Sequence, residues 1–424
     1  MEAIADSHSL AAADRTEERQ WRKLRRLLRL AYDRVPFYQS RFRSIGAEPE
    51  DIKTPQDFER FPILSRKDIL DHVGELLAYP REKLIRGCTS GSTSRTLMIY
   101  TKKSDRGYRH AAWRRAEGWI GANFLWPSCE IGISSVTSNV PEKFGRWRRF
   151  IQPHYRYSFQ PLTLEDVERL LRDLAIIRPR RVHAFPSYLR PLAQAMLERG
   201  IALEPAPLVL TGVGELCSEE EQRIIEKGFG APYYDFYASR ENTMMAAQCR
   251  SRQGYHVLTG HVYLEILQHN GCPSPPGQPG RVVVTDLDSL GMLYVRYENE
   301  DIAAWSGRQC ACGRTEPMLE KIHGRFLDTL IDRNGTVCLG SGTIKPLRAV
   351  LDENHVRQFQ FRQTLAGRLE ILTVPGLLWA PGDGRQIAAV LEQELGGNME
   401  IVVHNVDRID PEPSGKTRLV IGMG

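Results

Sequence analysis

The chain has 424 residues, of which 42% are hydrophobic and 26% are charged. This length is more than one hydrophobic core usually organises, so one large and one small globular domain are expected and general disorder is not. Lys and Arg number 57 against 52 Asp and Glu, and so small an excess does not favour a nucleic-acid partner. Residues 1–15 lack a signal-peptide pattern, and no apolar run reaches the about 20 residues that span a bilayer. A cytoplasmic protein without a membrane span is therefore expected.

The first predicted element is an amphipathic helix over Gln20–Val35, where leucines recur at helical spacing among arginines. Pro36 follows as a stop signal. The basic face could contact a membrane or an acidic partner, but a solvated face that covers a core edge is favoured.

Between residues 84 and 340, short apolar runs alternate with helix-like stretches, and this alternation predicts an α/β fold with crossover helices. The runs predicted as strands are Leu208–Leu210, Val282–Thr285 and Leu293–Arg296, and the predicted helices include Leu164–Ile177 and Ser218–Lys227.

The chain changes character after Ile331, where Asp332–Gly335 reads as a turn. The remaining residues carry strands and helices of their own, as a small domain would. The sequence therefore predicts a large domain over 1–328 and a small C-terminal domain over 329–424.

A loop rich in hydroxyl groups, Thr89–Arg95, lies between the apolar stretches Leu84-Ile85 and Leu97–Tyr100. Backbone N–H groups and hydroxyls in such a loop can donate to phosphate oxygens, and Arg95 adds positive charge. Serine-rich turns are common, so by itself the loop is weak evidence.

Four residues in two distant segments have the character of a zinc site. Cys310 and Cys312 form a close thiol pair, and Cys249 with His256 could supply two further ligands. Three sulfurs and one imidazole favour zinc over magnesium or calcium, and four protein ligands leave no open position, which indicates a structural role. Separate buried thiols and a core histidine are the alternative. The other cysteines are expected to pack as small apolar residues: Cys88, Cys129, Cys217, Cys272 and Cys338.

Several further motifs follow one another in a characteristic order, and Pro36–Tyr38 and Phe61–Lys67 precede them. Together they resemble the acyl-adenylate-forming (ANL) superfamily, in the branch of phenylacetate-CoA ligases and capsule-biosynthesis (CapK-like) proteins. The similarity runs from about Trp21 to Val420. The ordered motifs are Thr89–Arg95, Thr211–Glu215, Tyr237–Glu241, Arg296–Asp301, Gly324-Arg325 and Gly415-Lys416.

This resemblance implies a large adenylate-forming domain of layered sheets and helices, followed by a small mobile α+β lid. It also implies an ATP-dependent ligase that adenylates a carboxylic acid, releases pyrophosphate and transfers the acyl group to coenzyme A. An amine or a carrier-protein thiol as acceptor fits the same motifs, and a non-catalytic nucleotide-binding homologue is a further alternative. Mg²⁺ is the implied metal cofactor, and a homodimer is expected because members of the branch commonly pair.

The resemblance also implies roles for individual residues at the nucleotide. Glu241 matches the magnesium ligand, a hard oxygen donor. Lys416 matches the lysine that the lid brings to the α-phosphate, and Asp328 lies at the hinge. Asp301 and Arg325 match the ribose contacts, with Arg325 also near the phosphates. The remaining nucleotide contacts are Thr89, Ser90, Gly91, Ser92 and Thr93 at the phosphates, and Gly214, Glu215, Asp235 and Tyr237 beside the adenine.

The chain departs from the family pattern at several of these motifs. The departures are Ser94, Thr96, Ala238, Arg240, Asn299 and Glu300. They place the fine geometry of the loop and of the ribose contact in question, and the first four of them motivate the non-catalytic alternative.

The resemblance implies that the acid lies beside the adenylate, between the aromatic segment Phe185–Tyr188, the Gly212 turn and Tyr237-Ala238. Aromatic walls suit an aryl or arylacetic acid, although Phe185 and Tyr188 fit a plain core equally well. The basic run Arg146, Arg148 and Arg149, just before His154, could meet the phosphates of coenzyme A, but a solvated basic face is favoured. The predicted pocket residues are Phe185, Tyr188, Gly212, Tyr237 and Ala238.

Overall fold

The chain folds into two compact units, of which the larger holds most residues up to 321 and the smaller most of those from 322 onward, together with 300–303. A computed structural model describes residues 2–88, 97–123, 125–132, 154–157, 164–325, 329–334, 337–339, 356–376, 378–395, 397–409 and 420–422. Asp328, the predicted hinge, lies outside these ranges, so the domain boundary at 328/329 stays a prediction.

The predicted entry helix is part of a longer helix, α1 (Glu2–Arg34). It ends at Arg34, one residue before the predicted end, because the residue before a proline avoids the helical region. Val35 is extended, and Pro36 starts the next helix. Leu24, Leu27 and Leu28 are fully buried, so the apolar face belongs to the core. The short helices that follow are α2 (Pro36–Ser44), α3 (Pro55–Glu59) and α4 (Arg66–His72), with 3-10 turns at Pro49–Asp51 and Arg81–Lys83.

A hairpin brackets the hydroxyl-rich loop. Strands β1 (Ile85–Cys88) and β2 (Met98–Thr101) pair antiparallel, with Cys88 opposite Met98. The two ends of the loop are therefore held together, while residues 89–96 lie outside the described part of the chain.

The larger unit is built on one mixed sheet with the strand order β10-β11-β12-β13-β9-β8-β7-β6-β5-β3-β4. Strands β4, β3, β5, β6 and β7 are parallel, whereas β7, β8, β9 and β13 pair antiparallel in turn. The first group is β3 (Ser128–Ile131), β4 (His154–Tyr157), β5 (Arg181–Ala184), β6 (Val209–Val213) and β7 (Tyr233–Ser239). The second is β8 (Thr243–Gln248), β9 (Tyr255–Val257), β10 (Val262–Leu267), β11 (Gly280–Asp286), β12 (Tyr297–Trp305) and β13 (Met318–Arg325).

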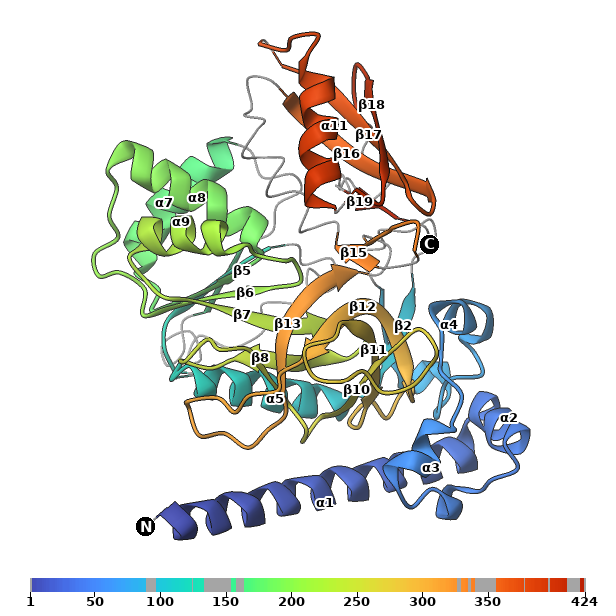
Figure 1. Cartoon of the computed structure of the whole chain (residues 1–424). Helices are drawn as coiled ribbons and strands as arrows, with labels where there is room; N and C mark the ends of the chain where they lie inside the picture. Colours follow the sequence, from blue (N-terminus) through green and yellow to red (C-terminus); the bar gives the residue numbers. More distant parts are fainter. Residues whose placement is uncertain are drawn as a thin grey trace. The chain divides into compact units, whose positions relative to one another are not determined.

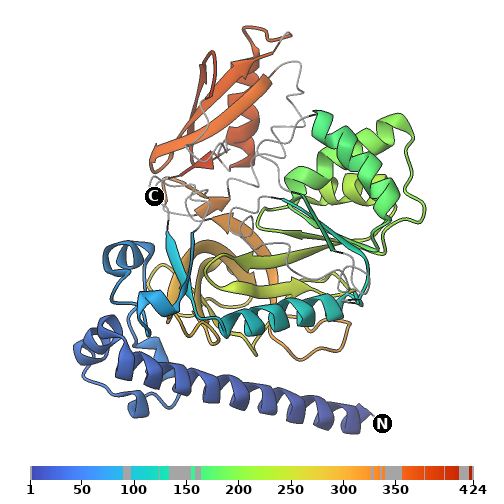
Figure 2. The same ribbon diagram turned by 180° about the vertical axis from the view of Figure 1, so that it is seen from behind.

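Helices cover both faces of the parallel part of this sheet. Helices α7 (Leu164–Ile177), α8 (Pro186–Arg199) and α9 (Glu219–Phe229) lie on one face, and α5 (Asp105–Trp119) lies on the other, as both views show (Figures 1 and 2). Each face has its own apolar core. The predicted α/β fold with crossover helices is confirmed. Among the described helices, none has the length and apolar character needed to cross a bilayer.

One predicted strand is wrong. Leu293–Arg296 is a buried loop whose backbone groups have several partners in place of a strand ladder. The Tyr38 hydroxyl donates to the Leu293 carbonyl at 2.9 Å and accepts from the Val295 N–H at 3.0 Å, and the Asp286 N–H of β11 donates to the Tyr294 carbonyl at 3.1 Å. Arg296 has a φ of +50°. The apolar run was misleading because burial alone does not distinguish a strand from a loop whose polar groups find other partners.

The smaller unit has an α+β fold. Its four-stranded sheet has the order β18-β17-β16-β19, and one helix, α11, packs on it through an apolar core that includes Phe361, Ile371 and Leu391. A separate hairpin joins β14 and β15. The elements are β14 (Thr329–Ile331), β15 (Val337–Leu339), β16 (Val356–Leu365), β17 (Arg368–Pro375), α11 (Asp383–Glu394), β18 (Glu400–Asn405) and β19 (Val420–Ile421).

Candidate active site and metal centre

A predicted pocket residue and a predicted adenine contact lie on neighbouring parallel strands. Gly212 of β6 is the register partner of Asp235 of β7, and the carboxyl ends of such strands are where α/β sheets bind ligands. Position 212 has no room for a side chain, because the Tyr233 hydroxyl occupies the space that a Cβ would need. The glycine therefore lets the Tyr233 ring fill this part of the sheet.

The turn after β6 brings the predicted adenine and acyl residues together. Gly214 has a φ of +74°, which favours glycine, and the Phe185 ring lies 3.1 Å from where its Cβ would be. Glu215 ties the turn to the start of α8, since its carboxylate accepts from the N–H and the hydroxyl of Ser187, both at 3.0 Å. Tyr188 stands 6.1 Å from Phe185, ring centre to ring centre. Both aromatic residues also pack in the core under α7 to α9.

Asp235, predicted beside the adenine, is a buried carboxyl. Its Oδ2 accepts from the Tyr255 hydroxyl at 2.7 Å, and its own N–H donates to Gln248 Oε1 at 2.9 Å. Burial raises the pKa of Asp235 to about 7, although the bond from Tyr255 acts in the opposite direction. The folded protein therefore holds a proton here that a solvated aspartate would lose well below neutral pH.

Replacing Asp235 with Asn is expected to make the fold less sensitive to pH. The pKa of Asp235 is raised from 3.8 to about 7, so between about pH 4 and pH 7 the unfolded chain loses a proton that the folded chain keeps, and stability falls as pH rises. Asn is neutral throughout and can still accept from Tyr255. Relative to the wild type, the variant should be more stable at pH 8 than at pH 5 by about 3 kcal/mol in the free energy of unfolding, as measured by urea unfolding at both pH values. An equal difference at the two pH values would contradict this account.

Tyr237 and Ala238 end β7 at an irregularity in its pairing with β8. The Tyr237 hydroxyl accepts from Asn299 Nδ2 at 2.9 Å, and both side chains are buried. Asn299 is one of the departures from the family pattern, and this bond gives it a partner on β7. It connects the strand that precedes Glu241 to β12, which carries Asp301.

Glu241, the predicted magnesium ligand, sits in the tight turn between β7 and β8 and is 5% exposed. Arg109 of α5 donates from Nη2 to the Glu241 carbonyl at 2.9 Å and from Nη1 to the Arg240 carbonyl at 3.3 Å. Sequence reasoning missed Arg109, because more than 130 residues separate it from the turn and no local motif marks it.

The remaining predicted contacts are only partly described. Asp301 lies half-buried in β12, directly after Glu300, whose φ is +65°. Arg325 ends β13, but its side chain lies outside the described part of the chain. Thr89, Ser90, Gly91, Ser92, Thr93 and Lys416 also lie outside the described residues.

Cys249, His256, Cys310 and Cys312 come together as predicted. Their ligand atoms all lie within 4.8 Å of one another, and all but Cys312 are buried. The two halves meet because β9, which carries His256, pairs with β8 on one side and with β13 on the other. Cys249 follows β8, and the other two cysteines precede β13.

The geometry of this cluster suits a tetrahedral zinc ion. Zn–S bonds of about 2.3 Å and Zn–N bonds of about 2.1 Å place tetrahedral ligand atoms about 3.6–3.8 Å apart. Cys249 Sγ and Cys310 Sγ are 3.6 Å apart, and Cys312 Sγ is 3.3 Å from His256 Nε2. Burial lowers the pKa of His256, which favours the neutral ring that a metal binds.

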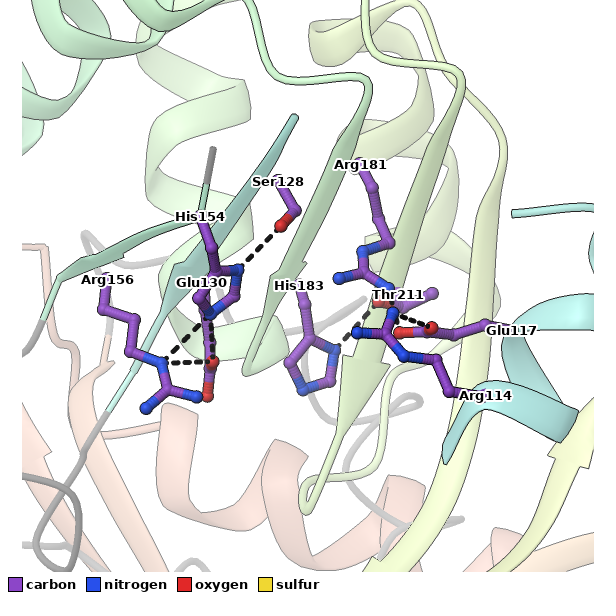
Figure 3. Close-up of polar contacts among 9 residues, drawn as sticks. All are labelled: Arg114, Glu117, Ser128, Glu130, His154, Arg156, Arg181, His183 and Thr211. Atoms are coloured by element: carbon purple, nitrogen blue, oxygen red, sulfur yellow. Dashed lines mark hydrogen bonds and ion pairs between the residues drawn. The ribbon is translucent and has the colours of Figure 1, made fainter. Parts of the chain in front are cut away.

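A second polar cluster lies on the sheet face beside α5 (Figure 3). His154 bonds to the Ser128 hydroxyl at 2.7 Å and to Glu130 at 3.3 Å, and buried Arg181 forms an ion pair with Glu117. Burial opposes ionisation of Glu130, yet the bond from His154 and nearby positive charge lower its pKa to about 2. These groups bond to one another. The basic run Arg146, Arg148 and Arg149, for which a coenzyme A contact was considered, lies outside the described residues.

Comparison with known proteins finds relatives that are phenylacetate-coenzyme A ligases or Protein CapK. No protein-family model matches the chain. The phenylacetate-coenzyme A ligase of Thermus thermophilus is 27% identical over 326 residues, which cover 75% of this chain and 72% of the relative. Protein CapK of Staphylococcus aureus is 21% identical over 381 residues, 87% of this chain and 81% of CapK.

The fold has a close counterpart among solved structures. A crystal structure of 2-hydroxyisobutyryl-CoA ligase in the postadenylation state, in complex with R3-HIB-AMP, matches with a TM-score of 0.75 at 20% identity and covers 97% of this chain and 90% of that one. This likeness shows the fold. Together with the sequence similarity above, it supports the resemblance of the chain to the acyl-adenylate-forming superfamily, in the branch of phenylacetate-CoA ligases and CapK-like proteins.

Proposed function

We propose that this protein is an ATP-dependent ligase that adenylates a carboxylic acid, releases pyrophosphate and transfers the acyl group to coenzyme A. The observation that carries the proposal is the sequence similarity to phenylacetate-coenzyme A ligases over three quarters of the chain. The placement of Gly212, Tyr237 and Glu241 at the ends of two adjacent strands supports it.

Attack of a carboxylate on the α-phosphate creates negative charge that the site must neutralise. In this proposal Glu241 holds Mg²⁺, which when bound neutralises phosphate charge. Thr89–Thr93 hold the phosphates, and Gly214, Glu215 and Tyr237 line the adenine. Asp301 accepts from the ribose hydroxyls, since one carboxylate can take both.

The smaller unit is proposed to act as the lid. It would bring Lys416 to the α-phosphate during adenylation and withdraw it afterwards, with the hinge at Asp328 and the domain boundary at 328/329. A flexible ammonium suits a charge that must arrive and leave. Arg325, on the strand that leads to this unit, is proposed to contact the ribose or the phosphates.

The acid is proposed to be aryl or arylacetic. Phe185 and Tyr188 form an aromatic wall next to the Gly214 turn, with Gly212 and Ala238 at the adjoining strand ends. A flat aromatic acid would be recognised by ring contacts of this kind. A short aliphatic acid would leave such a wall poorly covered.

We also propose a structural zinc ion at Cys249, His256, Cys310 and Cys312. It would tie the segment after β8 to the loop before β13, which leads toward Arg325. A homodimer and a cytoplasmic location are proposed as well: the first because pairing is common in the branch, the second because ATP and coenzyme A are consumed.

The test is acid-dependent pyrophosphate release from ATP and Mg²⁺, screened over aryl, arylacetic and aliphatic acids with and without coenzyme A. Release with an aryl or arylacetic acid and a thioester product by mass spectrometry would support the whole proposal. Release without a thioester would point to an amine or carrier-protein acceptor. ATP binding without release for any acid would favour a non-catalytic homologue.

A further inference from the structure

The turn that carries Glu241 has an unfavourable backbone conformation. Thr243, at its end, has a φ of +58°, a region that β-branched residues rarely adopt. Such a conformation persists only where the surrounding structure holds it, and these conformations cluster at functional sites. The turn therefore needs contacts that offset its strain.

Two contacts hold this turn. Within it, the Asn242 N–H donates to the Ser239 hydroxyl at 3.0 Å. From outside, Arg109 donates to two successive carbonyls, those of Arg240 at 3.3 Å and of Glu241 at 2.9 Å. The rigid fork of a guanidinium can make both bonds at once, whereas the single ammonium of a lysine is a point donor.

Arg109 is itself fixed by the helix that carries it. Asp105, one turn earlier in α5 and fully buried, accepts from the N–H groups of Leu290 at 3.1 Å and Gly291 at 3.0 Å. Further along, Ala112 and Ala116 pack in the same core as residues of β8. The Arg109 guanidinium is therefore carried by a helix, α5, that is held in place at its start and along its length.

The charge of Arg109 also has a buried counterpart. Asp286 of β11 is 4% exposed, and burial raises its pKa to about 6, while the positive charge of Arg109 lowers it. Arg109 therefore interacts electrostatically with a buried carboxyl as well as bonding to the backbone of the turn. A neutral side chain there would lose both interactions.

We propose that Arg109 is a positioning residue for adenylation, which clamps the Arg240 and Glu241 carbonyls so that the Glu241 carboxylate is held in one orientation before Mg²⁺ and ATP bind. This rests on the proposed role of Glu241. Arg109 acts through the backbone of the turn and not through the substrate. Small misplacements of a catalytic group are costly, about 100-fold in rate for about 1 Å.

The test compares three variants of the full chain. Arg109→Met keeps the length but removes every donor, and Arg109→Lys keeps the charge with one donor group. Arg106→Met is the matched control, because Arg106 is exposed on the same helix. Hydrogen exchange of the 239–243 turn reports on the clamp, and Mg²⁺ dependence of acid-dependent pyrophosphate exchange reports on positioning.

Arg109→Met should speed hydrogen exchange in the turn, lower kcat by about 10- to 100-fold, and raise the Mg²⁺ concentration for half-maximal rate, with the KM for the acid nearly unchanged. Arg109→Lys should give exchange rates, kcat and Mg²⁺ dependence between those of Arg109→Met and the wild type. If Arg109→Met does not fold, Arg109→Lys alone provides the test. Turn exchange equal to that of the Arg106→Met control overturns the proposal, as does a loosened turn with wild-type kcat and Mg²⁺ dependence.

Failure of the proposed function would look different. If the wild type shows no pyrophosphate exchange with any acid, the proposed ligase activity is contradicted, but the positioning role of Arg109 is not. Affinity for ATP with Mg²⁺, measured by calorimetry, then replaces the rate. An affinity unchanged in Arg109→Met and Arg109→Lys would overturn the positioning role.

Discussion

Replacing Cys310 with Ser is expected to release a bound zinc ion and to lower the thermal stability of the protein. Cys310 is buried, and its sulfur lies 3.6 Å from that of Cys249, so its loss breaks a closed set of four ligands. Because a structural metal contributes its binding energy to folding, the free energy of unfolding should fall by on the order of 3 kcal/mol or more. Metal analysis of the purified protein and a thermal melt measure the two effects.

Cys272→Ser is the matched control for this experiment, because Cys272 is an exposed cysteine outside the cluster. It should retain one zinc ion per chain and the wild-type Tm. Chelation of the wild-type protein should reproduce the melt of Cys310→Ser, and added zinc should reverse the chelator effect. A wild type that binds no zinc when it is supplied, and that melts like Cys310→Ser, would show separate thiols and a core histidine instead.

Replacing Glu241 with Gln should abolish adenylation while leaving the fold intact. The amide has the same shape, and the backbone bonds from Arg109 do not involve the side chain. The amide lacks the negative charge that a magnesium ligand supplies. The rate of acid-dependent pyrophosphate exchange should therefore fall by about 1,000-fold. The exchange assay is run over a range of Mg²⁺ concentrations, with a melt to verify folding.

Glu220→Gln is a suitable control, since Glu220 is exposed on α9. It should exchange pyrophosphate at the wild-type rate. High Mg²⁺ should rescue Glu241→Gln only partly. Full activity of Glu241→Gln at ordinary Mg²⁺ would remove Glu241 from the proposed machinery and place the metal elsewhere.

Local patterns predicted several elements well. The helix over Leu164–Ile177 is found with the same bounds, because a stripe of apolar residues at helical spacing defines both its face and its length. Ser218 caps α9, with Glu221 completing a capping box, and such caps are readable from sequence. The start of α1 was missed by 18 residues, because its first half has no apolar periodicity to reveal it.

For the metal cluster, the sequence predicted the four residues but not the strand order that brings them together. Spacing and the resemblance to the family selected Cys249, His256, Cys310 and Cys312, and these four residues meet. What brings them together is the position of β9 between β8 and β13. The local sequence of these strands does not predict this order, because which strands pair depends on how the faces of the whole sheet are buried.

The fold class and the resemblance to acyl-adenylate-forming enzymes could be predicted from the sequence, since they depend on local periodicity and on residue types in a fixed order. Only the tertiary structure showed that Arg109 clamps the Glu241 turn, that Tyr255 bonds to Asp235, and that Leu293–Arg296 is a buried loop. Each of these is a contact between segments distant along the chain. Such partners are set by packing and by the need of every buried polar group for a bond, neither of which a local pattern records.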